Sequence, residues 1–207
     1  MSDVYPKRWL SILAMVVFAS AVVDTQRETI PEAVARGSTG RIRTAPSGLA
    51  PAMTEILRDT DMVVRGTIGK PRSYLSEDQR DVYTDYPIMN FVILYQARVH
   101  ASRVSGVAQS VTVTQLGGTI LMNGVNFTQT EHGLGPLEPG AEGLFLLQRI
   151  DSRDRIAGMF FGAFSISGGV VHRLTKVESF APEFQGAPAA TVVAEIVASA
   201  RALREKP

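Results

Sequence analysis

The sequence predicts a mainly β fold, namely a small OB-like antiparallel β-barrel of about five strands with a short N-terminal helix and a C-terminal amphipathic helix. Three observations indicate this class. Short apolar segments with alternating or β-branched residues recur between Met62 and Leu174. Residues that favour turns separate these segments, and helical spacing of apolar residues occurs only at the two flanks. We therefore expect helices beside the barrel and none between its strands.

Length and composition indicate one globular domain with terminal segments. The chain has 207 residues, of which 45% are hydrophobic and 20% charged, and these values exclude a disordered, collagen-like or coiled-coil protein. A formal net charge of +1 creates no strong field that would gather nucleic acid or anionic lipid. The absence of cysteine excludes disulfides, thiolate metal sites and a lipid-modified cysteine. Packing must therefore provide the stability.

Residues 1–21 have the layout of a secretory signal peptide. Lys7 and Arg8 precede an apolar run, and small residues near its end suit cleavage after Ala21. The run has roughly 15 residues, fewer than the ~20 that span a membrane comfortably as a helix. We therefore expect an exported protein, periplasmic or extracellular. The alternatives are an uncleaved membrane anchor and a buried helix of the fold.

Residues 22–48 are interpreted as a flexible linker, and residues 49–207 as the barrel domain with its C-terminal helix. The linker stretch is polar and is interrupted by several Pro and Gly residues. Such a stretch buries too little apolar surface to offset the entropy that is lost on ordering. Its arginines, Arg36, Arg41 and Arg43, are expected on a solvated surface.

The first half of the barrel domain predicts one helix and two strands. A short helix is expected at residues 51–58, because apolar residues recur there at helical spacing. A first strand at 62–68 ends before Pro71, since proline cannot continue a strand ladder. A long second strand is expected at 89–99, where apolar residues alternate along one side. A polar connection joins the two strands.

The second half predicts further strands that are separated by turns. In order, the expected elements are a third strand at 110–115, a bend at Gly117 and Gly118, a long loop at 119–136 with one short pairing at most, a fourth strand at 143–149, a polar turn at 151–155 and a hairpin at 159–174. Two adjacent glycines permit the bend because neither has a Cβ. The order Pro139-Gly140 suits a type II turn before the fourth strand.

The C-terminal segment predicts an amphipathic helix. Its apolar stripe comprises Val192, Val193, Ile196, Val197, Ala200 and Leu203. This stripe is too continuous to be left in water, so we expect the helix to dock on its own barrel. An oligomer interface is the alternative.

The order of these signals carries a resemblance to known proteins. The segments that carry it are 61–68, 82–84, 111–113, 117–118 and 137–140, within residues 49–174. In this order they resemble a group of uncharacterised bacterial exported proteins with an OB-like β-barrel, distantly similar to the netrin-like domain of tissue metalloproteinase inhibitors. The resemblance implies a fold and no established activity. Those inhibitors reach a protease metal through an N-terminal cysteine, so the absence of cysteine here excludes that mechanism.

Residue types that carry catalysis or bind metals form no motif in the sequence. His100, His132 and His172 lie in three separate elements, and none has a second histidine three or four residues away. Ser165 and Ser167 alternate along an expected strand instead of occupying a nucleophile elbow. We therefore expect no catalytic residue, no metal and no other cofactor.

Candidate ligand-binding residues are expected at the rim of the barrel. They are Arg72, Tyr74, Tyr83 and Tyr86 in the polar connection, and Asn123, Asn126 and His132 in the long loop. Aromatic and arginine side chains at such a rim can form a recognition surface. The alternative is that one or more of the tyrosines covers the end of the barrel.

Together these observations predict a non-catalytic exported binding or protein-interaction module, whose partner is another protein or an envelope component. Nucleic acid is not expected, because the net charge is near zero and few aromatic residues lie on the strands. Membrane contact is expected only if the N-terminal segment is retained. Two alternatives stay open. One is a hydrolase that uses the loop at 117–136, with Glu131 beside His132, and the other is a membrane-anchored envelope structural protein.

Overall fold

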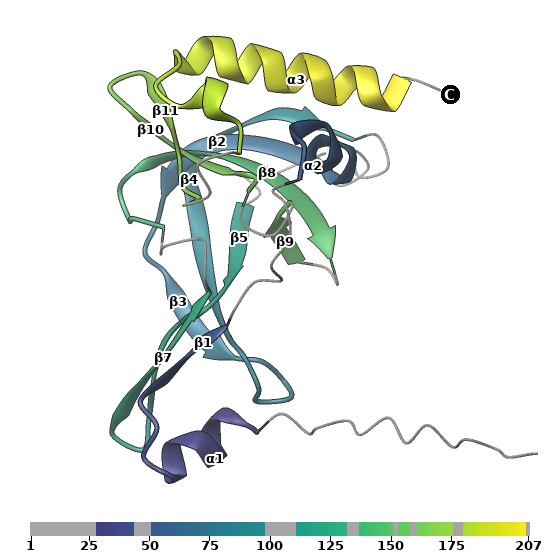
Figure 1. Cartoon of the computed structure of the whole chain (residues 1–207). Coiled ribbons are helices and arrows are strands. Elements are labelled where there is room, and N and C mark those ends of the chain that lie inside the picture. The colour runs from purple at the N-terminus through teal and green to yellow at the C-terminus, as the bar shows by residue number, and fades with distance from the viewer. Residues whose placement is uncertain are drawn as a thin grey trace, which may run out of the picture.

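The computed structural model is mainly β, with helices at both ends, as the sequence predicts (Figure 1). It describes residues 28–43, 51–97, 111–131, 137–150, 153–157, 161–175 and 180–205. In chain order the strands are β1 (Gly40–Arg43), β2 (Met62–Ile68), β3 (Arg72–Leu75), β4 (Val82–Gln96), β5 (Val111–Leu116), β6 (Gly118–Met122), β7 (Val125–Glu131), β8 (Glu142–Ile150), β9 (Arg153–Ile156), β10 (Ala163–Ser167) and β11 (Val170–Arg173). The helices are α1 (Ile30–Ala35), α2 (Met53–Asp59), the 3-10 helix η2 (Pro182–Phe184) and α3 (Ala189–Glu205). The predicted signal peptide at 1–21 lies outside the described residues.

A closed barrel forms the centre of the fold. Strands β8, β2, β4, β5 and β9 pair in that order, and β9 pairs again with β8, which closes a ring of five strands. Neighbouring strands are antiparallel except for β5 and β9, which are parallel. Apolar side chains fill the core, among them Ile88, Val113 and Phe145. The prediction of a small, mainly β barrel is therefore confirmed.

Strand β4 belongs both to the barrel and to an extension that projects from it. The strand is 15 residues long, and its buried residues alternate through Ile88 before a bulge at Asn90, where φ is 47°. Gly66 of β2 lies opposite this bulge, and a Cβ at that position would come within 2.6 Å of the Ile88 side chain. The bulge bends the strand. Before it, even-numbered residues of β4 face the core, and beyond it odd-numbered residues do.

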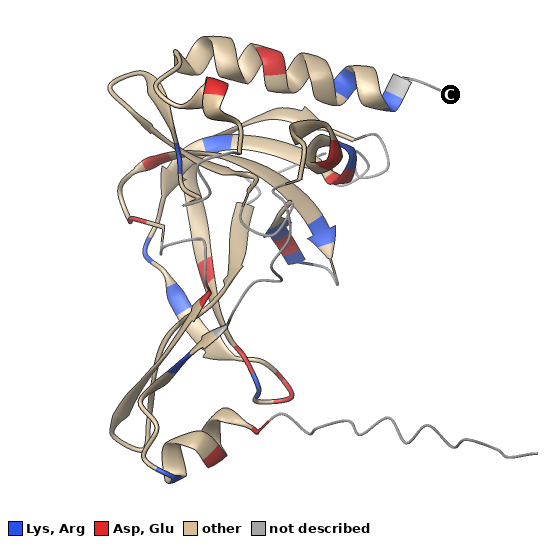
Figure 2. Ribbon diagram, in the orientation of Figure 1, with Lys and Arg blue, Asp and Glu red and all other residues tan. Residues whose placement is uncertain are grey.

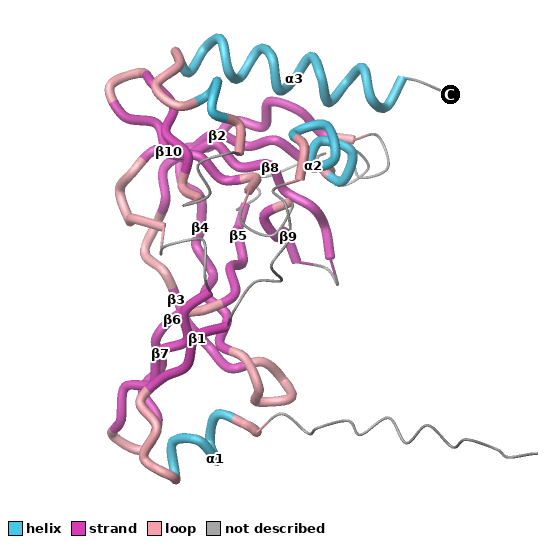
Figure 3. The backbone as a smooth tube through the Cα atoms, in the orientation of Figure 1, coloured by secondary structure: helices cyan, strands magenta, loops and turns pink. Residues whose placement is uncertain are grey.

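The narrow extension joins the barrel to α1 (Figure 3). It combines β3 and the first part of β4 with the three-stranded sheet β1-β7-β6. A second hydrophobic cluster fills it, and its buried members are Ile30, Ala33, Val34, Val82 and Phe127. The extension therefore has a small core of its own.

The linker prediction for residues 22–48 needs correction, because its described part contains α1 and β1. Pro31 and a capping box between Thr29 and Glu32 begin the helix. Strand β1 forms by parallel pairing with β7, which lies far away in the sequence. The few apolar residues of this segment are sufficient for order because they pack against Val82 and Phe127 from other elements.

The predicted long loop at 119–136 is a β-hairpin over its described length. Strands β6 and β7 pair antiparallel around Asn123 and Gly124, and both of these residues have positive φ. An Asn-Gly pair is a strong signal for a two-residue hairpin turn. The prediction allowed only one short pairing here and underestimated the hairpin, because polar residues fill the solvent-facing positions of β7. The remainder of the predicted loop, including His132, lies outside the described residues.

Two further boundaries differ from the prediction. The polar turn expected at 151–155 contains strand β9, whose charged residues give no strand signal and which is held by pairing with β5 and β8. The strand expected at 89–99 begins at Val82, because polar residues alternate with buried ones in its first part. The other predicted strands and helices are present within a few residues of the expected positions.

The C-terminal helix docks on its own chain, as expected. Helix α3 contacts α2 and β4, and Val192, Ile196 and Ala200 are each 1% exposed. Figure 1 shows α3 across one end of the barrel and α1 at the far end of the extension. Across the described ranges, no helix is both long and apolar enough to cross a membrane.

Candidate functional site

One face of four neighbouring strands brings together tyrosine, arginine and acidic side chains. Tyr74 of β3 pairs with Tyr83 of β4, and Asp85 of β4 pairs with Thr114 of β5. Thr114 in turn pairs with Arg155 of β9. Paired residues, and residues two apart on one strand, point to the same side of a sheet. The strand registers therefore place these side chains on one face.

The tyrosines and arginines of this face lie close to one another. The rings of Tyr74 and Tyr83 have centroids 6.2 Å apart. The Cζ atom of Arg153 lies 5.7 Å from the Tyr74 centroid and 5.4 Å from the Tyr83 centroid, and the Cζ atom of Arg155 lies 5.4 Å from the Tyr83 centroid. These distances are in the range of cation-π contacts. We call the group the arginine-tyrosine cluster, and it consists of Tyr74, Tyr83, Asp85, Thr114, Arg153 and Arg155.

Hydrogen bonds hold the centre of the cluster. The Tyr74 hydroxyl donates to Asp85 Oδ1 at 3.1 Å, and the Thr114 hydroxyl donates to the same oxygen at 2.7 Å. Burial, followed by the neighbouring Asp85 carboxylate, raises the pKa of Tyr74 above its ordinary value. Tyr74 therefore stays protonated and keeps donating to Asp85 at neutral pH.

The two arginines of the cluster have donors that the described residues do not use. No described carboxylate forms an ion pair with Arg153 or Arg155, whereas Arg149 lies 2.7 Å from Asp154. The Nε atom of Arg155 is enclosed without a hydrogen-bond partner, which costs on the order of 1–3 kcal/mol. Figure 2 shows that β9 carries both basic and acidic residues. Its acidic residue Asp154 forms an ion pair with Arg149.

The structure brings three of the predicted site residues together. Tyr74 and Tyr83 are members of the cluster, and the exposed Arg72 pairs across the strands with Asp85 on the same face. These three residues therefore share one face of the sheet. The surface lies on strands β3 and β4, where the sequence indicated a polar connection.

The other predicted site residues lie elsewhere. Tyr86 is 3% exposed and belongs to the barrel core, so its place on a recognition surface must be corrected. Its position differs from that of Tyr83 because three residues along a strand reverse the side, and burial raises its pKa. Asn123 occupies the turn of the β6-β7 hairpin, and Asn126 is exposed on β7, in the other sheet. His132 lies outside the described residues.

Sequence reasoning missed four members of the cluster. Arg153 and Arg155 lie in a segment for which the sequence predicts a turn, and their spacing of two residues is the available signal. Thr114 lay within a predicted strand as an ordinary β-branched residue. Asp85 had no signal, because its hydrogen-bonding partners come from β3 and β5.

A small cavity lies where β5 bends into β6. Its volume is about 120 Å³, and it is lined by Tyr86, Gln115, Leu116, Gly117, Gly118, Thr119, Thr128, Gln129, Thr130 and Glu131. Pockets for drug-sized ligands are usually about 300–1,000 Å³, whereas a water molecule occupies about 30 Å³ of the liquid. The cavity therefore suits a few water molecules better than an organic ligand.

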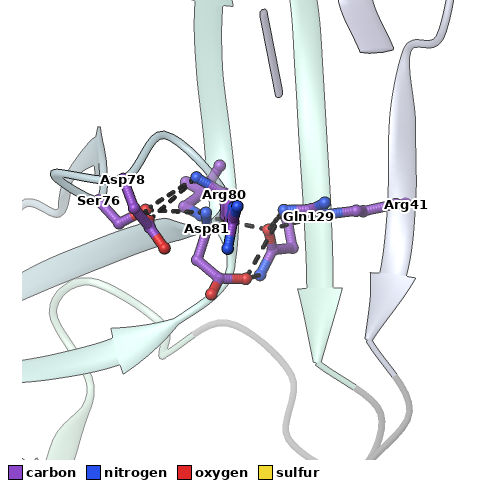
Figure 4. Close-up of polar contacts among 7 residues, drawn as sticks. Arg41, Ser76, Asp78, Arg80, Asp81 and Gln129 are labelled. Atoms are coloured by element: carbon purple, nitrogen blue, oxygen red, sulfur yellow. Dashed lines mark hydrogen bonds and ion pairs between the residues drawn. The ribbon is translucent and has the colours of Figure 1, made fainter. Parts of the chain in front are cut away.

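A polar network holds the extension together (Figure 4). Gln129 of β7 lies at its centre and is 1% exposed. Its amide oxygen accepts hydrogen bonds from Arg41 Nε at 3.3 Å and from Val82 N at 3.2 Å, and its amide nitrogen donates to Asp81 Oδ1 at 3.2 Å. Arg41 Nη2 also lies 3.6 Å from Asp81 Oδ1. The network joins β1 and β7 to the hairpin that carries both tyrosines of the cluster.

The cluster offers the chemistry of an anion site. Within the part of the chain that the structure describes, no three His, Asp or Glu side chains are grouped closely enough to hold a metal ion. Arginine presents several N–H donors in a planar fork that matches the two oxygens of a carboxylate or phosphate group. Arg153 and Arg155 are therefore the residues that can bind an anionic oxygen group.

Comparison with known proteins assigns no family. The chain matches no protein-family model and no curated protein sequence. The resemblance to OB-like exported proteins therefore stays a prediction. A fold alone does not imply a function, so the geometry of the cluster carries the functional argument.

Proposed function

We propose that this chain is a non-catalytic binding module and that the arginine-tyrosine cluster is its recognition surface. The observation that carries the proposal is the state of Arg153 and Arg155. Both guanidinium groups lie over tyrosine rings, and neither is neutralised by a described carboxylate. Stacking orders a guanidinium group while its in-plane donors stay available. Tyrosine and arginine are also enriched among the residues that dominate binding at protein interfaces.

The groups of the cluster suit binding better than proton transfer. An arginine keeps its proton at every physiological pH. The raised pKa of Tyr74 keeps this hydroxyl protonated near neutral pH. A general acid or base needs a pKa near the working pH, and the pKa of Tyr74 is raised further away from neutrality. The cluster is therefore proposed to recognise a ligand without transforming it.

The proposal includes export to the periplasm or the extracellular space. Lys7, Arg8, the apolar run after them and the small residues before Val22 support it. The proposed partner is accordingly another protein or an envelope component. Determination of the N-terminus of the native protein tests this part, and we expect it near Val22. A cytoplasmic protein that begins at Met1 would contradict it.

Capture of partners tests the recognition surface. Tagged protein is cross-linked in intact cells and purified, and its partners are identified by mass spectrometry. The double variant Arg153→Gln with Arg155→Gln is compared with wild type and with Arg201→Gln, which changes an exposed arginine of α3. We expect the double variant to lose specific partners and Arg201→Gln to keep them. Thermal unfolding of all three proteins confirms that folding is retained.

Two outcomes would contradict the proposal. Equal capture by wild type and the double variant would place recognition on another surface. Hydrolysis of ester or peptide substrates that is lost in His132→Ala would instead support the hydrolase alternative.

A further inference from the structure

We infer that the arginine-tyrosine cluster binds an extended acidic segment of a partner protein, with Arg153 and Arg155 receiving carboxylates from alternate residues of that segment. The inference rests on the proposed function and names the ligand chemistry of the same surface. The two arginines lie two residues apart on β9, so the pleat of the strand directs both side chains to the face of the cluster.

The spacing of the arginines matches an extended peptide. Residues two apart on a β-strand are separated by about 6.6 Å along the strand. An extended peptide repeats its side chains on each side at the same spacing, so acidic residues at alternate positions present carboxylates at that interval. Both arginines can therefore be engaged at once by a single short segment.

The charge of the site is complementary to such a segment. Asp85 accepts hydrogen bonds from Tyr74 and Thr114 and forms no ion pair with either arginine in the described structure. Arg155 is half-buried, and its Nε atom is enclosed without an acceptor. A carboxylate that approaches this guanidinium group would supply the acceptor that the described residues do not provide.

Two observations favour a short acidic peptide over an anionic polymer. The arginines cover the tyrosine rings, so a ring face that could stack on a sugar is already occupied. Proteins that bind polyanions use many phosphate or sulfate contacts along a basic surface, whereas this chain has a net charge of +1 and places Asp85 inside the cluster. The site has two cations, Arg153 and Arg155, and one carboxylate, Asp85, that is already hydrogen-bonded within the cluster. This arrangement suits a ligand that carries few negative charges.

Fluorescence anisotropy with defined peptides tests the inference. The probe is a labelled, end-blocked peptide of sequence Gly-Glu-Thr-Glu-Gly, titrated with the protein in its isolated form. The matched control peptide has glutamine at both glutamate positions, and heparin is the polysaccharide probe. We expect the glutamate peptide to bind at least about tenfold more tightly than the glutamine peptide. Added salt should weaken this binding, because salt screens exposed charges.

Protein variants assign the binding to the arginines. Arg155→Gln should lower affinity for the glutamate peptide at least about tenfold. Arg155→Lys should lower it by a smaller factor, because lysine keeps the charge and loses the planar fork. Arg201→Gln, on the exposed side of α3, should leave it unchanged. Circular dichroism of each variant shows whether the fold is intact.

Three results of the peptide titrations would overturn the inference. They are equal affinity for the glutamate and glutamine peptides, unchanged affinity in Arg155→Gln with the fold intact, and displacement of the peptide by heparin at lower concentration than by unlabelled peptide. The last result would assign the site to an anionic polysaccharide. Partner capture that depends on the arginines but is not displaced by the glutamate peptide refutes this inference alone. Capture that does not depend on the arginines refutes the proposed function as well.

Discussion

Replacement of Gln129 by leucine is expected to weaken the extension that carries the candidate site. Leucine has a similar volume, so the change in packing is small. The variant loses the acceptor for Arg41 and for the Val82 amide, and the donor to Asp81. The Gln129 side chain is buried, so leucine at this position leaves its former partners inside the extension. The variant therefore isolates the hydrogen bonding of the network from its packing.

The expected loss of unfolding free energy is about 3 kcal/mol. The Val82 N–H becomes a buried donor without a partner, which costs about 1–3 kcal/mol. Hydrogen bonds to charged groups contribute about 1.5–3 kcal/mol each. Only one such bond is counted, because the Arg41 and Asp81 side chains are 20% and 14% exposed and keep their ion pair at 3.6 Å. The apolar side chain of leucine returns about 1 kcal/mol.

Urea unfolding followed by circular dichroism measures this loss. A change of about 3 kcal/mol in a chain of this size corresponds to a melting temperature lower by about 6–12 °C. The matched control is Thr130→Val, an isosteric change on the exposed face of the same strand, which should stay within about 0.5 kcal/mol of wild type. A Gln129→Leu protein as stable as this control would refute the reasoning. It would show that desolvation of the charged groups cancels the gain from their hydrogen bonds.

Three further predictions concern the core, the pH dependence and the turns. Ile196→Asp on the docked side of α3 should lower the unfolding free energy by at least about 3 kcal/mol. The control Ala194→Asp, on the exposed side of α3, should lower it by less than about 1 kcal/mol. Equal shifts of the two variants in thermal unfolding would mean that α3 is not docked. Burial raises the pKa of Tyr86 in the folded chain. The stability that the neutral Tyr86 side chain contributes is therefore fully present below about pH 10, the pKa of tyrosine in the unfolded chain, and is lost as pH rises through the raised pKa of the folded state. Tyr86→Phe should therefore reduce the decline of unfolding free energy between about pH 9 and pH 11, and an unchanged slope would contradict this. In urea unfolding, Gly118→Ala should lower the unfolding free energy by about 3 kcal/mol and Gly124→Ala by about 1 kcal/mol. Both positions have positive φ, but only a Cβ at position 118 would lie against side-chain hydroxyls. Equal losses of unfolding free energy would rule out the steric contribution.

Strands that bury much of their surface are predictable from the sequence. β2 and β8 carry nearly continuous β-branched or apolar residues, because neighbours cover both of their faces. The bend after β5 is predictable from Gly117 and Gly118, whose φ values are 103° and 137°. In each of these elements, the local residue pattern and the tertiary environment require the same conformation.

The candidate site was predictable only in part. Tyr74 and Tyr83 could be proposed because aromatic residues stood out in a polar segment. Arg153 and Arg155 could not be joined to them, because only the parallel pairing of β9 with β5 brings these arginines to the same face. A contact between segments that are distant in the sequence leaves no local periodicity in either of them.

The sequence by itself determined the class of fold, most strands of the barrel and the amphipathic character of α3, because burial on one side imposes a period of two on strands and of 3.6 on helices. The tertiary structure decided which side of β4 is the core. Alternation shows that Tyr83 and Tyr86 point apart, but only packing against neighbouring strands buries Tyr86 and leaves Tyr83 in the cluster. The tertiary structure also decided that β1 and β9 form strands. Their ladders use backbone N–H and C=O groups that every segment possesses, and these hydrogen bonds form only when a partner strand is in place.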